Sequence, residues 1–208
     1  MLKIWGRKNS INVQKVMWTV GELGLKHKRI DAGMEFGRNR EPEFLKMNPN
    51  GLVPVIEDEG GVVLWESNTI VRYLGARYGG ENFWPDDPGK RADAEKWMDW
   101  MISTVNPAIS PVFMGLVRTP PEQRDTKAIE AGRVKTADLL KIFDDHMARR
   151  LYVAGPALSI GDIPMGCLIN RWFALPIERP ELPNVAAYFE RLKQRPAFVE
   201  HVGNIPLT

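Results

Sequence analysis

The apolar positions in the first 78 residues switch repeatedly between the two-residue period of strands and the 3.6-residue period of helices. Four short strands are expected, at residues 2–5, 28–31, 53–56 and 62–65. Three helices are expected, at residues 13–23, 41–45 and 67–78. The strand–helix–strand order at the start predicts a right-handed parallel crossover, so this part of the chain reads as a βαβαββα domain of the α/β class.

The second half of the chain reads as helical. Residues 80–89 are rich in glycine, proline and aspartate, a composition typical of a linker. Beyond them, apolar residues at helical spacing predict a long helix that Pro107 and Pro111 bend or interrupt, and a further helix through residues 137–151. The sequence therefore predicts an α/β domain at 1–79, a linker at 80–89 and an all-α helical bundle at 90–208.

A hairpin in the first half carries two informative details. Gly60-Gly61 separates two apolar runs and predicts a tight turn, because glycine adopts the positive φ angles of primed turns. Pro54 lacks an N–H group and therefore belongs at the start or the edge of its strand. A cis Val53–Pro54 bond would turn the backbone of Val53 toward a ligand.

Glu66 and Ser67 fall where the following helix is expected to begin. Ser67 can cap that helix, and the free N–H groups of the first turn attract a carboxylate. Glu66 beside it attracts an ammonium group. The pair therefore suits the end group of an α-amino acid.

Composition and charge narrow the class of protein. A formal net charge of +2, with scattered basic residues, gives no reason to expect nucleic-acid binding. No apolar run spans a bilayer and no signal-like segment is present, so we expect a cytoplasmic protein. The single cysteine, Cys167, excludes an internal disulfide and lies at a core position on an apolar helix face. His27, His146 and His201 match no metal-ligand spacing, so no metal is expected.

The segments N-P-N-G-x-V-P-V-I (48–56) and W-E-S-N-x-I-x-x-Y-L (65–74) resemble the glutathione-site core of the cytosolic glutathione transferases. The resemblance covers nearly the whole chain and is greatest to bacterial and theta-like serine members. It implies a thioredoxin-like domain that binds glutathione as co-substrate, a helical domain with a hydrophobic substrate pocket, and a homodimer that serves detoxification. It also implies that Pro54 is cis, that Val53 pairs with the cysteinyl backbone of glutathione, and that Glu66-Ser67 hold its γ-glutamyl end.

The catalytic donor is expected just after the first strand, where the family places it. A thiol with a pKa of about 8.5 is mostly protonated at neutral pH, so the enzyme must aim donors at the sulfur. The loop at 7–15 has no tyrosine or cysteine; Ser10 can donate its hydroxyl and Asn12 its amide, and either can equally cap the helix that follows. Without a cysteine there, a mixed disulfide through the loop is excluded.

The remaining contacts with substrates are less well defined by the sequence. Leu52 stands where many family members have a lysine or arginine for the glycine carboxylate of glutathione, so that end falls to Arg38, Asn39 or Arg40. Trp172-Phe173 either close the electrophile pocket or pack in the core. The pocket itself is expected between the serine loop and the second domain, with Trp100, Ser103, Asn106 and Met114 as lining, although such residues also fit a helix core.

Ser159 and Asp162 have the spacing of a capping box, in which each side chain satisfies the backbone N–H of the other. Leu158 and Ile163 flank them as a hydrophobic staple. The serine side alone is worth roughly 0.5–2 kcal/mol. The glutathione transferases carry the same S-x-x-D box, which implies a role in folding.

Three functions are compatible with these features. The first is conjugation of the glutathione thiolate to small hydrophobic electrophiles. The second is a glutathione-dependent disulfide reductase or peroxidase that uses the same site. The third is a non-catalytic module of the same fold that binds other proteins, against which the intact Glu66-Ser67 pair argues.

Overall fold

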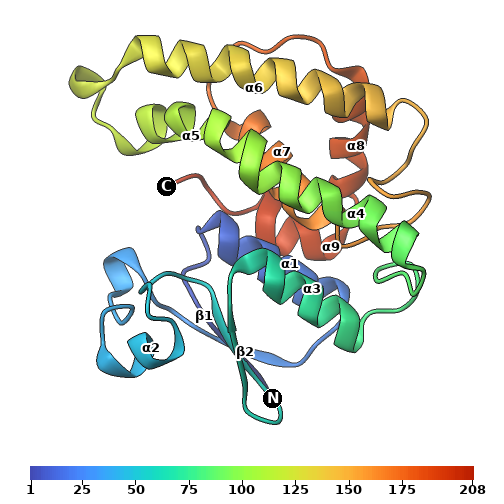
Figure 1. Cartoon of the computed structure of the whole chain (residues 1–208). Helices are drawn as coiled ribbons and strands as arrows, with labels where there is room; N and C mark the ends of the chain where they lie inside the picture. Colours follow the sequence, from blue (N-terminus) through green and yellow to red (C-terminus); the bar gives the residue numbers. More distant parts are fainter.

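A four-stranded mixed sheet forms the centre of the N-terminal domain in the computed structural model, which describes residues 1–208 (Figure 1). The strands are β1 (Leu2–Trp5), β2 (His27–Ile30), β3 (Val55–Asp58) and β4 (Val62–Trp65). Their order in the sheet is β2-β1-β3-β4. β1 and β2 are parallel, as the crossover predicted, and the other two pairs are antiparallel. The turn from β3 to β4 has positive φ at Gly60 and Gly61, which confirms the expected hairpin.

Three helices accompany the sheet: α1 (Ile11–Glu22), α2 (Pro42–Met47) and α3 (Ser67–Tyr78). α1 and α3 pack against each other, and their apolar sides share one core with β1 and β3. α2 packs separately, through Phe44 on Ala32 and Val55. A short 3₁₀ turn, η1 (Met34–Phe36), lies in the glycine-rich segment before α2. The βαβαββα order is therefore confirmed.

Several predicted boundaries shift by one or two residues. β2 begins at His27, one residue before the expected start. β3 begins at Val55 and not at Val53, because Pro54 has no N–H to donate to the ladder. α1 begins at Ile11, two residues before the first periodic apolar residue, with Ser10 at the N-cap position.

The second domain consists of helices that lie beside the sheet domain (Figure 1). Its first helical stretch combines α4 (Pro88–Trp100), η2 (Met101–Val105), α5 (Asn106–Phe113) and η3 (Met114–Arg118). After the short turn η4 (Pro121–Gln123), the remaining elements are α6 (Thr126–Met147), α7 (Asp162–Ala174), α8 (Pro183–Lys193), α9 (Pro196–Phe198) and η5 (Val199–Gly203). α6 ends at Met147, so the expected continuation to Leu151 is wrong.

Pro107 and Pro111 do not interrupt the first of these helices. The helical stretch continues from Pro88 to Arg118, and both prolines lie within α5. The wider π-helical turns η2 and η3 flank α5. A π-turn accommodates an extra residue within a continuous helix, and so a proline can be tolerated without a break.

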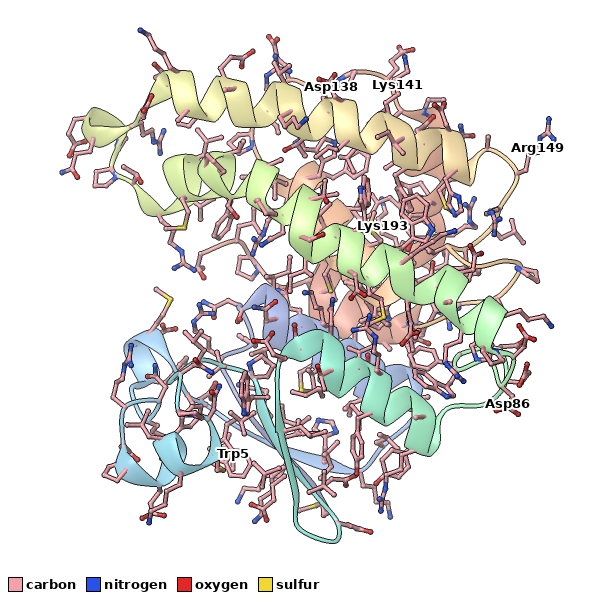
Figure 2. The ribbon with its side chains drawn as sticks, in the orientation of Figure 1. Trp5, Asp86, Asp138, Lys141, Arg149 and Lys193 are labelled. Atoms are coloured by element: carbon pink, nitrogen blue, oxygen red, sulfur yellow. The ribbon has the colours of Figure 1, made fainter.

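The same stretch, Pro88–Arg118, has an 18-residue window with a mean hydropathy of 1.3, so by length and composition alone it could cross a membrane. Core helices of soluble proteins pass the same test. Here α4 packs on α7 and α5 packs on α6 within the helical domain. The exposed Asp138 and Lys141 lie on the side of α6 that points away from the sheet domain (Figure 2).

α7 is the central helix of the interface between the domains. Eleven of its 13 residues are buried, because α1 covers it from one side and α4 and α8 from others. Trp18 of α1 is fully buried against Gly166 of α7. Glu22 at the end of α1 accepts two hydrogen bonds from Arg195, at 2.8 and 2.6 Å. These contacts hold α1, and the loop before it, in a defined position against the helical domain.

The start of α7 has one of the two hydrogen bonds expected of a capping box. The Asp162 carboxylate accepts from the backbone N–H of Ser159 at 2.8 Å and from its hydroxyl at 2.9 Å. The expected hydrogen bond from the Asp162 N–H to the serine hydroxyl is absent; that N–H donates to the Ser159 carbonyl at 3.1 Å. Because the serine carbonyl takes this N–H, the N–H is not available to the hydroxyl.

Candidate active site

Ser10 lies at the junction of the loop after β1 and helix α1. Ser10 is 8% exposed, and its hydroxyl has no hydrogen-bond partner within the chain. The hydroxyl oxygen is accessible to solvent. Although Ser10 occupies the N-cap position of α1, its side chain makes no capping hydrogen bond. Its O–H group is therefore free to donate to a ligand.

Asn12, in the first turn of α1, faces the start of α3 within the N-terminal domain. Its Oδ1 accepts a hydrogen bond from the Ser67 hydroxyl at 3.3 Å and one from Lys15 Nζ at 3.1 Å. Lys15 Nζ also donates to the Ser67 oxygen at 3.4 Å. Because Oδ1 takes these hydrogen bonds, the amide nitrogen of Asn12 is left as a donor for a ligand. The three side chains form one hydrogen-bonded group.

Ser67 does not cap α3, contrary to the expectation from sequence. Glu66 occupies the N-cap position, and Ser67 is the first helical residue, 3% exposed, with its hydroxyl turned toward Asn12. The backbone of Glu66 has φ 70° and ψ 109°, a left-handed conformation that is strained for a side-chain-bearing residue. Such strain is concentrated at binding sites. The exposed Glu66 carboxylate makes no ion pair within the chain and stands beside the free N–H groups of the first turn of α3.

Val53 presents an unpaired segment of backbone. It precedes the cis Pro54, and the ladder of β3 with its neighbours begins only at Val55. Neither the N–H nor the C=O of Val53 makes a backbone hydrogen bond. An extended peptide can therefore pair with Val53 as an added strand would.

The residues named for the glycine end of glutathione lie in the segment between η1 and β3. Leu52, Arg38 and Arg40 are exposed. The amide of Asn39 donates to the Gly51 carbonyl at 2.7 Å, which commits one of its two hydrogens to holding the loop. Asn39 is thus partly a structural residue. This role could not be predicted from the sequence.

The four residues named for the electrophile pocket lie along α4, η2, α5 and η3. Ser103 and Met114 are exposed, whereas Trp100 packs edge-on against Trp97 at 5.1 Å between ring centroids. Asn106 is half-buried. Trp100 therefore contributes to the helical core as well as to any pocket. No hydrogen bond joins these four residues to the serine loop.

Trp172 and Phe173 pack in the helical domain. Trp172 is fully buried, and Phe173 stacks on Phe189 with 4.7 Å between ring centroids. Cys167 is 1% exposed, which confirms its predicted core position. Burial raises the pKa of the Cys167 thiol to about 12, so it is protonated at neutral pH.

Lys15 is a functional candidate that the sequence did not reveal. It is 1% exposed, and burial lowers the pKa of its ammonium group to about 8. Every residue from Val13 to Val20 is buried, because α3 and α7 cover both sides of the helix. No signal in a single sequence distinguishes this case.

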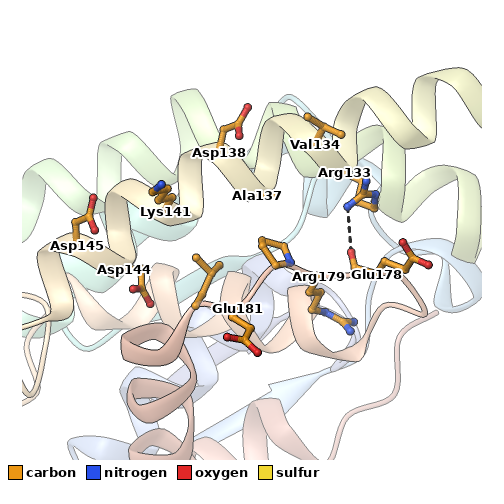
Figure 3. Close-up of a pocket in the computed structure, with 12 residues that line it drawn as sticks. Arg133, Val134, Ala137, Asp138, Lys141, Asp144, Asp145, Glu178, Arg179 and Glu181 are labelled. Atoms are coloured by element: carbon orange, nitrogen blue, oxygen red, sulfur yellow. Dashed lines mark hydrogen bonds between the residues drawn. The ribbon is translucent and has the colours of Figure 1, made fainter.

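A cavity of about 480 Å³ lies elsewhere, between α6 and the segment 178–182 (Figure 3). Its walls carry charges of both signs, such as Asp138, Lys141 and Glu181, and Arg133 donates to the Glu178 carbonyl at 3.3 Å. It contains no residue of the sheet domain. No group of three or more histidine, cysteine, aspartate or glutamate side chains is placed to hold a metal ion.

Comparisons with known proteins agree with this arrangement. The model of the glutathione S-transferase N-terminal domain matches residues 1–76, and that of the C-terminal domain matches residues 105–196. The chain is 44% identical to glutathione S-transferase GstB of Escherichia coli K12, with all of both chains covered. It is 31% identical to glutathione S-transferase 3 of Zea mays, with 99% of this chain and 95% of the relative covered.

Among solved structures, a theta class glutathione S-transferase from Xanthomonas axonopodis pv. citri with glutathione bound superimposes with a TM-score of 0.95. It is 43% identical in sequence, and the match covers 100% of this chain and 99% of that one. Two family models in sequence order, full-length relatives and a matching two-domain structure thus lead to one assignment: the chain belongs to the glutathione S-transferase family.

Proposed function

We propose that this glutathione S-transferase activates the thiol of glutathione with the hydroxyl of Ser10 and transfers the thiolate to a small electrophile. The observation that carries the proposal is the unpartnered, accessible hydroxyl of Ser10 at the end of the loop after β1. A hydroxyl that donates to a thiolate stabilises the charged form and so lowers the thiol pKa. The hydrogen bond to a charged acceptor is worth roughly 1.5–3 kcal/mol.

The rest of the site is proposed to hold glutathione along one line from α3 to the loop before β3. The γ-glutamyl carboxylate binds at the N-terminus of α3 with Ser67, and its ammonium group pairs with the free carboxylate of Glu66. The cysteinyl backbone pairs with the N–H and C=O of Val53, next to Pro54. Asn39, with Arg38 and Arg40, is left for the glycine carboxylate. The amide nitrogen of Asn12 adds a second donor near the sulfur.

The electrophile is proposed to enter between the serine loop and the helical domain, past Ser103, Asn106, Met114 and Trp100. Sulfur attacks the electrophilic carbon, a C–S bond forms, and the leaving group departs with its bonding electrons. The thiol proton passes to solvent when the thiolate forms, so Ser10 donates a hydrogen bond and is not consumed. We further propose a cytoplasmic homodimer that serves detoxification, with domains at 1–79 and 90–208.

Substitution of Ser10 tests the proposal. The measurement is kcat/KM for glutathione conjugation to iodoacetamide in the wild type, Ser10→Ala, Ser10→Thr and Asn12→Ala. Thr126→Ala, which removes an exposed hydroxyl on α6, is the matched control. Ser10→Ala is expected to lose roughly tenfold to a hundredfold, Ser10→Thr to retain much of the rate, and the control to be unchanged.

Two results would overturn the assignment. If Asn12→Ala loses the rate and Ser10→Ala does not, the donor is the amide. If the wild type reduces a small disulfide rapidly with glutathione but does not conjugate iodoacetamide, the protein is a glutathione-dependent reductase that uses the same site.

A further inference from the structure

Three arginines from three separate elements converge beside the serine loop. Arg7 lies in the loop after β1, Arg118 ends η3, and Arg171 is on α7. Arg171 and Arg118 both lie over the ring of Phe113, with their guanidinium carbons 3.9 and 5.4 Å from its centroid. Burial lowers the pKa of Arg7, and the charge of Arg118 lowers it further. Burial likewise lowers the pKa of Arg171 to about 10, and the charges of Arg118 and Arg7 add to that effect.

None of these three arginines forms an ion pair with a carboxylate. Arg7 donates to Asn9 Oδ1 at 3.4 Å, and Arg118 donates to the sulfur of Met34 at 3.2 Å. The Nε atoms of Arg7 and Arg118 are buried without any partner. Arg171 is 9% exposed, makes no hydrogen bond within the chain, and has no nitrogen sealed from solvent.

Other partly buried arginines of this chain have acceptors within it: Arg124 and Arg179 donate to backbone carbonyls, and two more pair with carboxylates. Arg195 is held by both oxygens of Glu22, and Arg72 by Glu95 and Asp99. At the cluster, the one acidic group whose charge raises the pKa of Arg7 is the exposed Glu35. Like charges gathered in a poorly solvated site repel one another, and buried donors without acceptors cost free energy. An anion with several acceptor oxygens would offset both costs.

The cluster borders the proposed thiolate site on the side of the helical domain. The backbone N–H of Ser10 donates to the carbonyl of Arg7 at 3.3 Å, so the two residues share one turn. Arg171 lies one helical turn after Cys167. Cys167 in turn is close enough to Lys15 that the two side chains affect each other's pKa. Ser67, at the start of α3, reaches the same turn of α1 through its hydrogen bond to Asn12 at 3.3 Å.

We propose that Arg7, Arg118 and Arg171 form an anion-binding subsite that selects small electrophiles carrying a carboxylate. Arginine presents a planar fork that matches a carboxylate, and Phe113 holds two of the forks in place. This inference rests on the proposed function, because it takes the sulfur of glutathione to lie near Ser10. In the reaction, sulfur displaces a leaving group from the carbon next to the carboxylate, and the carboxylate itself is unchanged.

A matched pair of probes tests the subsite. Iodoacetate and iodoacetamide lose the same leaving group from the same kind of carbon and differ in charge. The measured quantity is the ratio of kcat/KM for iodoacetate to that for iodoacetamide, each corrected for the uncatalysed reaction with glutathione. The variants are Arg118→Gln, Arg118→Lys and Arg171→Gln, with Arg133→Gln, an arginine of α6 that pairs with Glu130, as the control.

In the wild type we expect the ratio to exceed that of the uncatalysed reaction. Arg118→Gln and Arg171→Gln should lower it roughly tenfold to a hundredfold, Arg118→Lys should lower it less, and Arg133→Gln should leave it unchanged. Since Arg118 is only half-buried at the end of a helix, its variants test the subsite even if Arg171→Gln does not fold.

Three outcomes would overturn the subsite. Equal losses with both probes would mean that the arginines act on the thiolate. A raised KM for glutathione with an unchanged ratio would mean that they hold a carboxylate of glutathione. A wild-type ratio no greater than that of the uncatalysed reaction would show that the enzyme does not prefer the charged electrophile. By contrast, a wild type that conjugates neither probe contradicts the proposed function itself.

Discussion

The ammonium group of Lys15 lies 3.4 Å from the hydroxyl oxygen of Ser67 and 3.1 Å from the side-chain oxygen of Asn12, sealed from solvent beneath both. One buried donor thus links the residue proposed to bind the γ-glutamyl end of glutathione with a residue proposed to lie near its sulfur. Ser67 is 52 residues from Lys15 in the sequence, and Asn12 is 3 residues from it. Lys15 therefore orients the site without itself being exposed to a ligand.

Replacement of Lys15 by methionine should weaken glutathione binding more than it slows turnover. Without the donor, Ser67 and Asn12 lose a shared partner, and only the 3.3 Å hydrogen bond between them still orients their side chains. We expect KM for glutathione to rise roughly fivefold to thirtyfold, which corresponds to one or two kcal/mol. Lys15→Gln keeps a donor, so its KM for glutathione should lie between those of the wild type and Lys15→Met. An unchanged KM in Lys15→Met would show that Ser67 is held by other contacts.

The same lysine should make stability depend on pH. Its pKa is about 8 in the folded protein because of burial, and about 10.4 in an unfolded chain. Between these pH values the unfolded chain binds more protons, so the free energy of unfolding increases as the pH rises from about 8 to about 10. The free energy of unfolding is measured in urea for the wild type and Lys15→Met, and the difference between them should increase by about 3 kcal/mol over this pH range. Parallel curves for the two proteins would contradict the low pKa.

Asp162 should matter more to stability than its partner Ser159. Its carboxylate accepts hydrogen bonds from Ser159 twice, from the Val153 N–H at 2.8 Å and from the Tyr188 hydroxyl at 3.0 Å. In Asp162→Asn an amide nitrogen faces some of these donors, which should cost roughly 2–4 kcal/mol. Ser159→Ala loses one hydrogen bond and should cost about 1 kcal/mol. Equal losses in urea unfolding would show that Asp162 acts through Ser159 alone.

Gly166 allows α1 and α7 to approach across the domain interface. A Cβ atom there would lie 2.7 Å from the ring of Trp18 and 2.8 Å from Leu192. Gly166→Ala should therefore destabilise the protein by roughly 1–3 kcal/mol, and Trp18→Phe in the same chain should relieve part of the loss. Gly80→Ala is the matched control, because a Cβ there meets nothing within 4 Å. Thermal unfolding of the three variants gives the comparison.

The elements set by local chemistry could be predicted from the sequence. Gly60-Gly61 predicted the hairpin because few other residues adopt positive φ in succession. Pro54 was expected at the start or the edge of its strand because it cannot donate to a ladder, and it directly precedes β3. The parallel pairing of β1 with β2 followed from the chain order. These features depend on neighbouring residues, so a single sequence contains what is needed.

The contacts between distant residues could not be predicted in the same way. Ser67 looked like a cap from its place at a helix start, but Asn12 and Lys15 reach it from another helix and turn its hydroxyl away. The burial of Lys15 could not be predicted either, because nothing in the pattern of α1 shows that α3 and α7 cover both sides of that helix. The arginine cluster likewise combines three elements that only the domain packing brings together.

The most direct test of the account is the pKa of the glutathione thiol when bound. The ultraviolet absorbance of the thiolate is followed against pH for glutathione saturating the wild type and Ser10→Ala, after binding of both has been checked by calorimetry. We predict that the wild type lowers the thiol pKa well below its free value, and that Ser10→Ala binds glutathione equally but leaves the pKa roughly one or two units higher than in the wild type. If the two proteins bind glutathione and give the same thiol pKa, Ser10 is not the donor and the proposed mechanism is wrong.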